Sequence, residues 1–190
     1  MSPLKKRIVW DLDDTLNTLT HSWLDWFYAR NRDARRVRFE DLRENPPNAL
    51  LGIPMQDYLD SLDAFRISPE ARDMQPVPAV RDWFREHGFC FEHHVLTARP
   101  IATIPHASGW LFTHFGRWIR HFHFVPARRV GDVVPDENEP KARVIERLGG
   151  AEAFVDDSPA NLEGAGDVVA NCILVPQPWN GAKGELALSL

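Results

Sequence analysis

Two acidic clusters are the residues of this sequence most able to do chemistry. The first holds Asp11, Asp13 and Asp14 and follows the apolar residues 8–10, and the second holds Asp156 and Asp157 and follows the apolar residues 153–155. Short apolar runs of this kind are typical of strands buried in a parallel sheet. The carboxyl ends of parallel strands meet at one crevice, where open α/β folds bind ligands. We therefore expect the two clusters to share one Mg²⁺ ion, which prefers oxygen ligands and accompanies phosphate.

Two further residues can hold phosphate oxygens at the same crevice. Thr97 follows an apolar run that ends at Leu96, and Lys141 follows Pro140 at the predicted start of a helix. A hydroxyl and an ammonium both donate hydrogen bonds to phosphate. A solvated lysine at a helix start is the alternative interpretation of Lys141.

Length and composition limit the classes of protein that fit. The chain has 190 residues, of which 44% are hydrophobic and 26% charged, as in an ordinary globular protein with one core and a small subdomain. The net charge of −5 argues against a nucleic-acid polymer or a membrane surface as partner. The two cysteines predict reduced, buried thiols in a cytoplasmic protein. No feature specifies an oligomeric state.

Strand-like runs alternate with helical patterns, which is typical of βαβ units. The predicted strands are residues 7–10, 92–96, 121–125, 153–155 and 172–175, and the main helices between them are 80–87, 108–118 and 140–148. We therefore predict a Rossmann-like parallel sheet with helices on both faces.

The region from residue 17 to residue 75 has a different texture. It contains helical patterns but no strand-like run. We predict a small helical cap inserted after the first strand, with residues 1–16 and 76–190 forming the core. Such an insert can cover the crevice and contact the substrate. Trp23 and Phe27 are candidate substrate contacts, although aromatic residues at helical spacing also suit a core. Arg99, just after Thr97, is a third candidate.

The order of these motifs resembles that of the haloacid dehalogenase-like (HAD) phosphohydrolases. In that family an apolar strand enters Asp-x-Asp-x-Thr, a second strand enters Thr or Ser, and a lysine and an acidic pair follow. The matching residues here are Asp11, Asp13, Thr15, Thr97, Lys141, Asp156 and Asp157. Residues 11–17 and 20–28 are also similar to the 5′(3′)-deoxyribonucleotidase-like branch. The sequence departs from the frequent Thr-Ser pair at Ala98, which leaves the substrate unassigned.

The resemblance implies a role for each matching residue. Asp11 would be the nucleophile that forms an aspartyl phosphate. Asp13 would be the general acid and base, a role that needs a raised carboxyl pKa. Phosphate would be held by Thr97, Lys141 and the loop residues Leu12, Asp14 and Ala98. The Mg²⁺ ligands would be Asp11, Asp13 through its backbone carbonyl, Asp156 and Asp157, with the order of the last two open.

The function predicted from the sequence is a Mg²⁺-dependent phosphatase that hydrolyses a small-molecule phosphomonoester, such as a nucleotide or another metabolite monophosphate. The alternatives are a phosphoprotein phosphatase and a non-catalytic binding protein with the same fold. The eight histidines do not follow a zinc-motif spacing. We therefore expect no metal site at His121 and His123, which share one face of their predicted strand.

Overall fold

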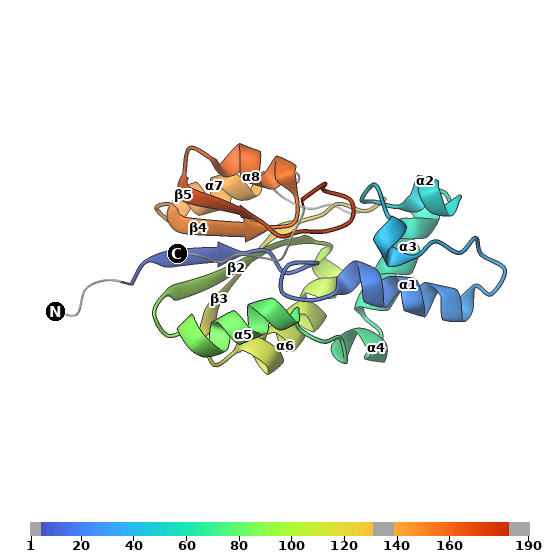
Figure 1. Cartoon of the computed structure of the whole chain (residues 1–190), viewed down its shortest axis with the longest axis horizontal. Helices are drawn as coiled ribbons and strands as arrows, with labels where there is room; N and C mark the ends of the chain where they lie inside the picture. Colours follow the sequence, from blue (N-terminus) through green and yellow to red (C-terminus); the bar gives the residue numbers. More distant parts are fainter. Residues whose placement is uncertain (1–4, 131–138, 183–190) are drawn as a thin grey trace.

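A parallel sheet positions the acidic clusters in the computed structural model of the chain, which describes residues 5–130 and 139–182 (Figure 1). Within these residues the sheet has five strands in the order β3-β2-β1-β4-β5. They are β1 (Arg7–Trp10), β2 (Glu92–Arg99), β3 (Ile119–Pro126), β4 (Ala151–Asp156) and β5 (Val169–Leu174). The predicted α/β Rossmann-like fold is confirmed.

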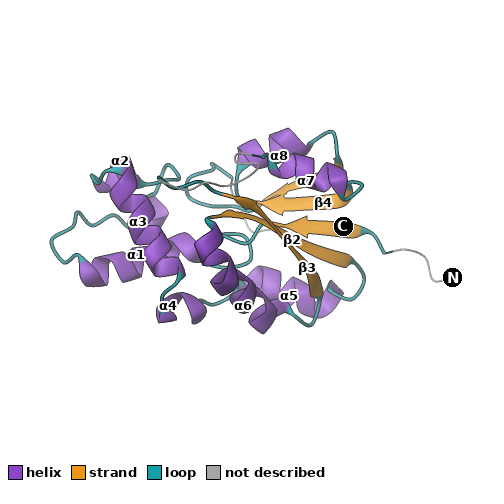
Figure 2. Cartoon of the chain, turned by 180° about the vertical axis from the view of Figure 1, so that it is seen from behind, coloured by secondary structure: helices purple, strands orange, loops and turns teal. Residues whose placement is uncertain are grey.

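The core helices cover both faces of the sheet (Figure 2). They are α5 (Pro78–His87), α6 (Ile104–Phe115) with the short 3-10 helix η2 (Ile101–Thr103) before it, α7 (Lys141–Arg147) and α8 (Pro159–Ala165). Alternation along β1 explains the two layers, because successive side chains point to opposite faces. Trp10 packs with Phe84 of α5, whereas Val9 packs with Ile145 of α7.

Strand β2 is longer than the sequence predicts. Its residue Val95 pairs with Trp10 at the end of β1, but pairing with β3 continues to Arg99, which lies opposite Pro126. Thr97 therefore lies inside a strand rather than after it. The extension projects Thr97 and Arg99 beyond the end of β1, toward the crevice.

The region between β1 and α5 is helical, and we call residues 17–75 the helical insert. It contains α1 (Leu19–Arg30), the 3-10 helix η1 (Phe39–Asp41), α2 (Asn48–Leu51), α3 (Met55–Arg66) and α4 (Pro69–Arg72). Its two ends lie side by side, since Asn17 forms a bridge with Pro76 and the Val77 N–H donates to the Leu16 carbonyl at 2.9 Å. The insert lies beyond the carboxyl ends of the strands (Figure 1).

The aromatic residues of α1 form the interior of the insert. Trp23 is fully buried, its ring centroid lies 5.1 Å from that of Tyr58, and its Nε1 donates to Ser61 Oγ at 3.1 Å. Phe27 is also buried and packs on Trp23 at 5.3 Å. This corrects the expectation that Trp23 and Phe27 contact a substrate: the insert needs them as its own core.

Both cysteines differ from the expectation. Cys90 and Cys172 are unpaired, as expected, but exposed. Cys90 lies in the turn before β2, and Cys172 lies on the edge strand β5, so neither position is enclosed by packed elements. Among the described residues, no helix has the length and apolar character required to cross a bilayer.

Phe84 offers a test of this packing. It is fully buried, and its ring lies 4.9 Å from Trp10 and 5.0 Å from Phe115. Phe84→Ala should lower the free energy of unfolding by about 3–5 kcal/mol, because it leaves a cavity between α5, α6 and the sheet. Phe112→Ala, at a position 45% exposed on α6, should change it by less than about 1 kcal/mol. Urea denaturation of both variants measures the difference, and equal losses would contradict this account of the core.

Candidate active site

The loop after β1 turns sharply away from the sheet. The Asp11 N–H still donates to the Val155 carbonyl of β4 at 2.8 Å, and the Leu16 N–H then closes back on the Leu12 carbonyl at 3.0 Å. Asp14 has a φ of 55°, in the left-handed region that non-glycine residues rarely adopt. The turn therefore leaves Asp11 and Asp13 at the carboxyl edge of the sheet.

Three carboxylates converge at that edge. Asp11 comes from the loop after β1, and Asp156 and Asp157 come from the end of β4 and the residue after it. One oxygen from each lies within 4.8 Å of the others, and all three side chains are buried. The pairing of β1 with β4 is the physical reason, because it places the two strand ends next to each other. The predicted convergence of the two acidic clusters is present in the structure.

Lys141 contacts two of these carboxylates, Asp11 and Asp156. Its Nζ lies 2.6 Å from Asp11 Oδ1 and 2.8 Å from Asp156 Oδ2, and its side chain is buried. Burial alone would lower the pKa of Lys141, but Asp11 and Asp156 outweigh it and raise that pKa. The solvated-lysine interpretation is therefore wrong.

Asp156 is held from several sides. Besides Lys141, its carboxylate accepts the Ser158 N–H at 2.8 Å and the Asn161 Nδ2 at 3.1 and 3.2 Å. Ser158 also caps α8 by accepting the Asn161 N–H. Asp157 is less constrained, accepting the Trp179 Nε1 at 3.1 Å. These contacts fix Asp156 firmly and leave Asp157 with more capacity to bind a ligand.

We call Asp11, Asp156 and Asp157 together the acidic cluster. This cluster carries more negative charge than Lys141 neutralises. Three carboxylates and one ammonium sum to a formal charge of −2 when all are ionised. Burial, and then the nearby carboxylates, raises the pKa of Asp11 well above its usual value despite Lys141. Burial and the neighbouring Asp14 and Asp156 raise the pKa of Asp157 to about 8. The cluster therefore retains protons unless a cation is added.

Asp14 secures the loop to the insert. Its carboxylate accepts the Thr20 N–H at 2.8 Å and the Thr20 hydroxyl at 2.6 Å, and burial raises its pKa to about 7. The Asp14 N–H, expected to bind phosphate, donates to Asn17 Oδ1 at 3.2 Å. The Leu12 side chain is fully buried in the core, so this residue can reach phosphate only through its backbone.

Asp13 differs from the expectation in its electrostatics. Arg99 forms a two-pronged ion pair with the carboxylate, with Nε 2.8 Å from Oδ2, and Arg66 Nη2 lies 3.0 Å from the same oxygen. Burial alone would raise the pKa of Asp13, but the two guanidinium groups outweigh it and lower that pKa. The expectation of a raised pKa is thus wrong for this arrangement. The carboxylates near Asp13 affect its pKa less than the two arginines that contact it do.

Arg66 was not identified from the sequence, and it links the insert to the core. It is the last residue of α3 and is buried. Its Nη1 lies 3.0 Å from Asp63, and Asp63 in turn binds Arg129, with Nε at 2.6 Å. Arg66 lies 53 positions from Asp13 in the chain, and no local pattern marks it. Trp179, 22 positions from Asp157, was missed for the same reason. Asn161 lies only five positions from Asp156 and was expected only as part of the helix that follows it.

The remaining predicted residues lie along β2. Thr97 is buried and points to the same face as Arg99, two residues later. Ala98 is exposed and pairs with Val125 of β3. The phosphate contacts assigned to Thr97 and Ala98 remain predictions.

Comparison with known proteins identifies the fold. No protein-family model and no curated sequence matches the chain. Among solved structures, a haloacid dehalogenase-like hydrolase from Streptococcus pneumoniae is similar with a TM-score of 0.56 and 13% identity, covering 86% of this chain and 81% of that one. This chain has the HAD-type hydrolase fold.

Two other solved structures are similar to this chain in fold. A HAD-superfamily hydrolase of subfamily IA from Geobacter sulfurreducens has a TM-score of 0.55 and 14% identity, with 89% of this chain and 91% of that one covered. A HAD-type hydrolase from Bacillus subtilis, whose structure was determined with magnesium bound, has a TM-score of 0.54 and 13% identity, with 91% and 87% covered.

The raised carboxyl pKa values predict how stability depends on pH. Asp157, with a pKa of about 8, and Asp14, with a pKa of about 7, bind protons in the folded protein that the unfolded chain has already released. Since the folded state then holds more protons, the free energy of unfolding should fall as pH rises from about 6.5 to 8. Asp157 should contribute roughly 1 kcal/mol per pH unit, and Asp14 about half of that because it loses most of its proton near pH 7. Thermal melts of the metal-free protein should show a falling Tm.

Asp157→Asn should make this decline shallower. Asp25→Asn removes a carboxyl that is 78% exposed on α1 and should leave the decline unchanged. A Tm that rises over this pH interval would show that the cluster does not retain protons.

Proposed function

We propose that this protein is a Mg²⁺-dependent phosphatase that hydrolyses a small phosphomonoester through a phosphorylated Asp11. The observation that carries the proposal is the convergence of Asp11, Asp156 and Asp157, with Lys141 in contact with the first two. The HAD-type fold of the similar hydrolases supports it.

The acidic cluster fits a Mg²⁺ ion. Its donors are hard carboxylate oxygens, its three carboxylates outnumber its one ammonium, and burial raises the pKa of Asp11 and Asp157. We assign Asp11, Asp156, Asp157 and the backbone carbonyl of Asp13 as ligands. When bound, Mg²⁺ would offset the charge of the phosphate and allow an anionic nucleophile to approach it.

Asp11 and its neighbours would carry out the transfer. A carboxylate oxygen of Asp11 attacks phosphorus while the bond from phosphorus to the leaving oxygen breaks. Lys141 already contacts Asp11 and would donate to a phosphate oxygen, as would the Thr97 hydroxyl and the backbone N–H of Leu12. Water then attacks phosphorus and releases Asp11. The Ala98 N–H is a further donor in this proposal, and the Asp14 N–H would have to leave Asn17 Oδ1 to become another.

Asp13 would move the proton in both steps. It gives a proton to the leaving oxygen and later takes one from the attacking water. Its ion pairs with Arg99 and Arg66 keep it ionised in the arrangement described above. A substrate that attracts these arginines would loosen the pairs and raise the pKa of Asp13, so that it becomes a proton donor only when the substrate is in place.

The surroundings of those arginines indicate an anionic leaving group. A cavity between the insert and the core is lined by the cationic side chains of Arg66, Arg72 and Arg99 and by His106 and Trp110. Its volume is about 10 Å³, room for one water at most, so the insert must move for a substrate to enter. We propose a leaving group that is small and carries a carboxylate or a second phosphate, a class that includes nucleotides.

The insert favours a small substrate over a phosphoprotein. It lies over the carboxyl ends of the strands, where a protein chain would need an open crevice. Phosphate release distinguishes an enzyme from a non-catalytic binding protein, which would bind phosphate compounds without releasing phosphate.

Replacing Asp11 tests the reaction. With Mg²⁺, the wild-type protein should release phosphate from members of a panel of nucleotides, sugar phosphates and carboxylated phosphate esters. Asp11→Asn should reduce kcat by more than the roughly 10²–10³-fold that loss of one stabilising contact costs, because no nucleophile remains. Asp25→Asn should keep full activity. Full activity of Asp11→Asn, or no hydrolysis of any panel member by the wild type, would refute the proposal.

Replacing Arg66 tests the leaving group. A charge-assisted hydrogen bond contributes about 1.5–3 kcal/mol, so Arg66→Gln should lower kcat/KM for anionic leaving groups by roughly 10–100-fold. The loss should be smaller for a neutral leaving group of similar size. Arg30→Gln, an exposed arginine of the insert paired with Glu70, is the control. Equal losses on both substrate types would show that Arg66 acts only on Asp13.

A further inference from the structure

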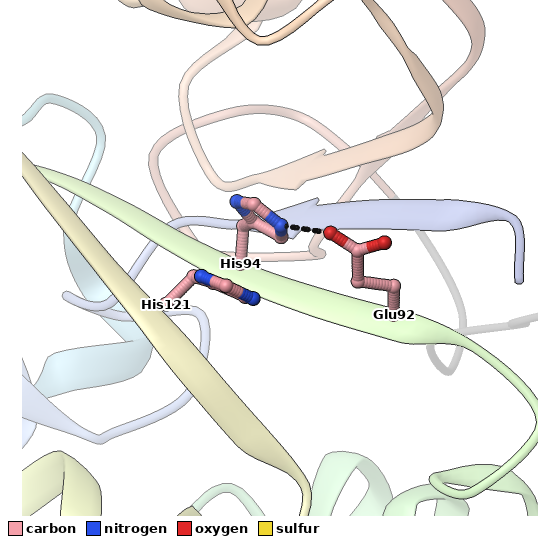
Figure 3. Close-up of side chains that lie close together, drawn as sticks. All are labelled: Glu92, His94 and His121. Atoms are coloured by element: carbon pink, nitrogen blue, oxygen red, sulfur yellow. Dashed lines mark hydrogen bonds and ion pairs between the residues drawn. The ribbon is translucent and has the colours of Figure 1, made fainter.

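A second group of metal-binding side chains meets on the sheet (Figure 3). Glu92 and His94 come from β2 and His121 comes from β3. One possible ligand atom from each lies within 4.8 Å of the others. The group shares no residue with the acidic cluster, so it is independent of the proposed phosphatase site.

Strand register creates this group. Glu92 and His94 are two residues apart and therefore point to the same face of β2. A β-bulge between β2 and β3 makes His93 face Ile119 and His94 face His121, so that Arg120 is the extra residue. Bulges of this kind redirect side chains, and this one brings His121 to the face of His94. A pattern search along one strand would miss the group for this reason.

Both ring nitrogens of the buried His94 are engaged by neighbouring side chains. Its Nε2 lies 2.6 Å from Glu92 Oε1, and its Nδ1 lies 2.9 Å from His123 Nε2. The His121 ring stacks on the His94 ring with centroids 4.1 Å apart. Histidines that bind metals use their second nitrogen in a hydrogen bond that fixes the ring. His123 provides that bond here.

Two rearrangements would convert this geometry into a tetrahedral site. Zinc bonds of about 2.0–2.1 Å place neighbouring tetrahedral ligands roughly 3.3 Å apart, which requires the hydrogen bond from His94 to Glu92 to open slightly. The stacked His121 ring must tilt toward the ion. His121 is exposed on an edge strand, and the outer torsion of histidine is broad, so little opposes the tilt.

One neighbouring charge opposes the binding of a cation. Arg7 Nε lies 3.5 Å from Glu92 Oε1, the oxygen that also contacts His94. Carbonyl groups hold this guanidinium, with Nη1 3.1 Å from the Gly150 oxygen. Glu92 Oε1, which faces His94, is nevertheless the oxygen best placed to serve as a ligand (Figure 3).

We propose that Glu92, His94 and His121 bind a divalent transition-metal ion of the zinc type. Two imidazoles and one carboxylate select Zn²⁺ and its neighbours over Mg²⁺, which prefers oxygen ligands alone. The ion would join the edge strand β3 to β2 and stabilise the folded state in proportion to its binding.

Metal titration of the full chain without a histidine tag tests this site. Zn²⁺ binding is measured by calorimetry in excess Mg²⁺, which fills the acidic cluster. The wild type should bind one equivalent and gain in Tm. His121→Ala and Glu92→Gln should each weaken binding by at least the roughly 10–100-fold that loss of a hydrogen-bonded supporting residue costs. His87→Ala is the matched control: it removes an exposed histidine whose Nε2 lies 3.6 Å from Glu86, and it should bind as the wild type does.

Cobalt supplies a second readout. Co²⁺ in a tetrahedral nitrogen and oxygen site absorbs visible light strongly, whereas Co²⁺ in an octahedral oxygen site absorbs weakly. The strong band should appear in the wild type and in Asp157→Asn but not in His121→Ala. The proposal is overturned if Zn²⁺ fails to bind the wild type, if His121→Ala and Glu92→Gln bind Zn²⁺ unchanged, or if Asp157→Asn alone abolishes binding. None of these outcomes depends on whether the protein is a phosphatase.

Discussion

The contact of the Lys141 ammonium with Asp11 and Asp156 underlies the whole acidic cluster. Pairing of β1 with β4 forces these carboxylates together where water is excluded. Burying like charges is costly unless a counter-charge lies close. Lys141 supplies part of that charge from the first turn of α7. The remaining negative charge explains both the raised pKa values and the suitability of the cluster for a divalent cation.

Asp13 shows the opposite electrostatic outcome only two residues from Asp11. Its carboxylate turns to Arg99 at the end of β2 and to Arg66 at the end of α3, and its pKa is lowered. This contact also ties the insert to the core. The arginines that keep Asp13 ionised also line the cavity beneath the insert, so the charge of Asp13 and the shape of this cavity depend on the same side chains.

Much of the architecture follows from local sequence. Apolar runs that end in acids predicted the strands and the converging clusters, because a buried parallel strand leaves a recognisable continuous pattern. The sequence predicted too short a strand β2, because its extension to Arg99 depends on pairing with β3. Trp23 illustrates a genuine ambiguity: helical spacing of aromatic residues fits a ligand surface and a core equally well, and only packing against Tyr58 decided the matter.

The sequence by itself determined the fold class, the order of the motifs and the residues that approach Asp11, because each depends on short-range pattern and on the geometry of parallel strands. Only the tertiary structure decided that Arg66 reaches Asp13, that Lys141 lies between two carboxylates, and that a bulge brings His121 to His94. These contacts join residues far apart in the chain. Their side chains meet through the packing of whole elements, which no local pattern records.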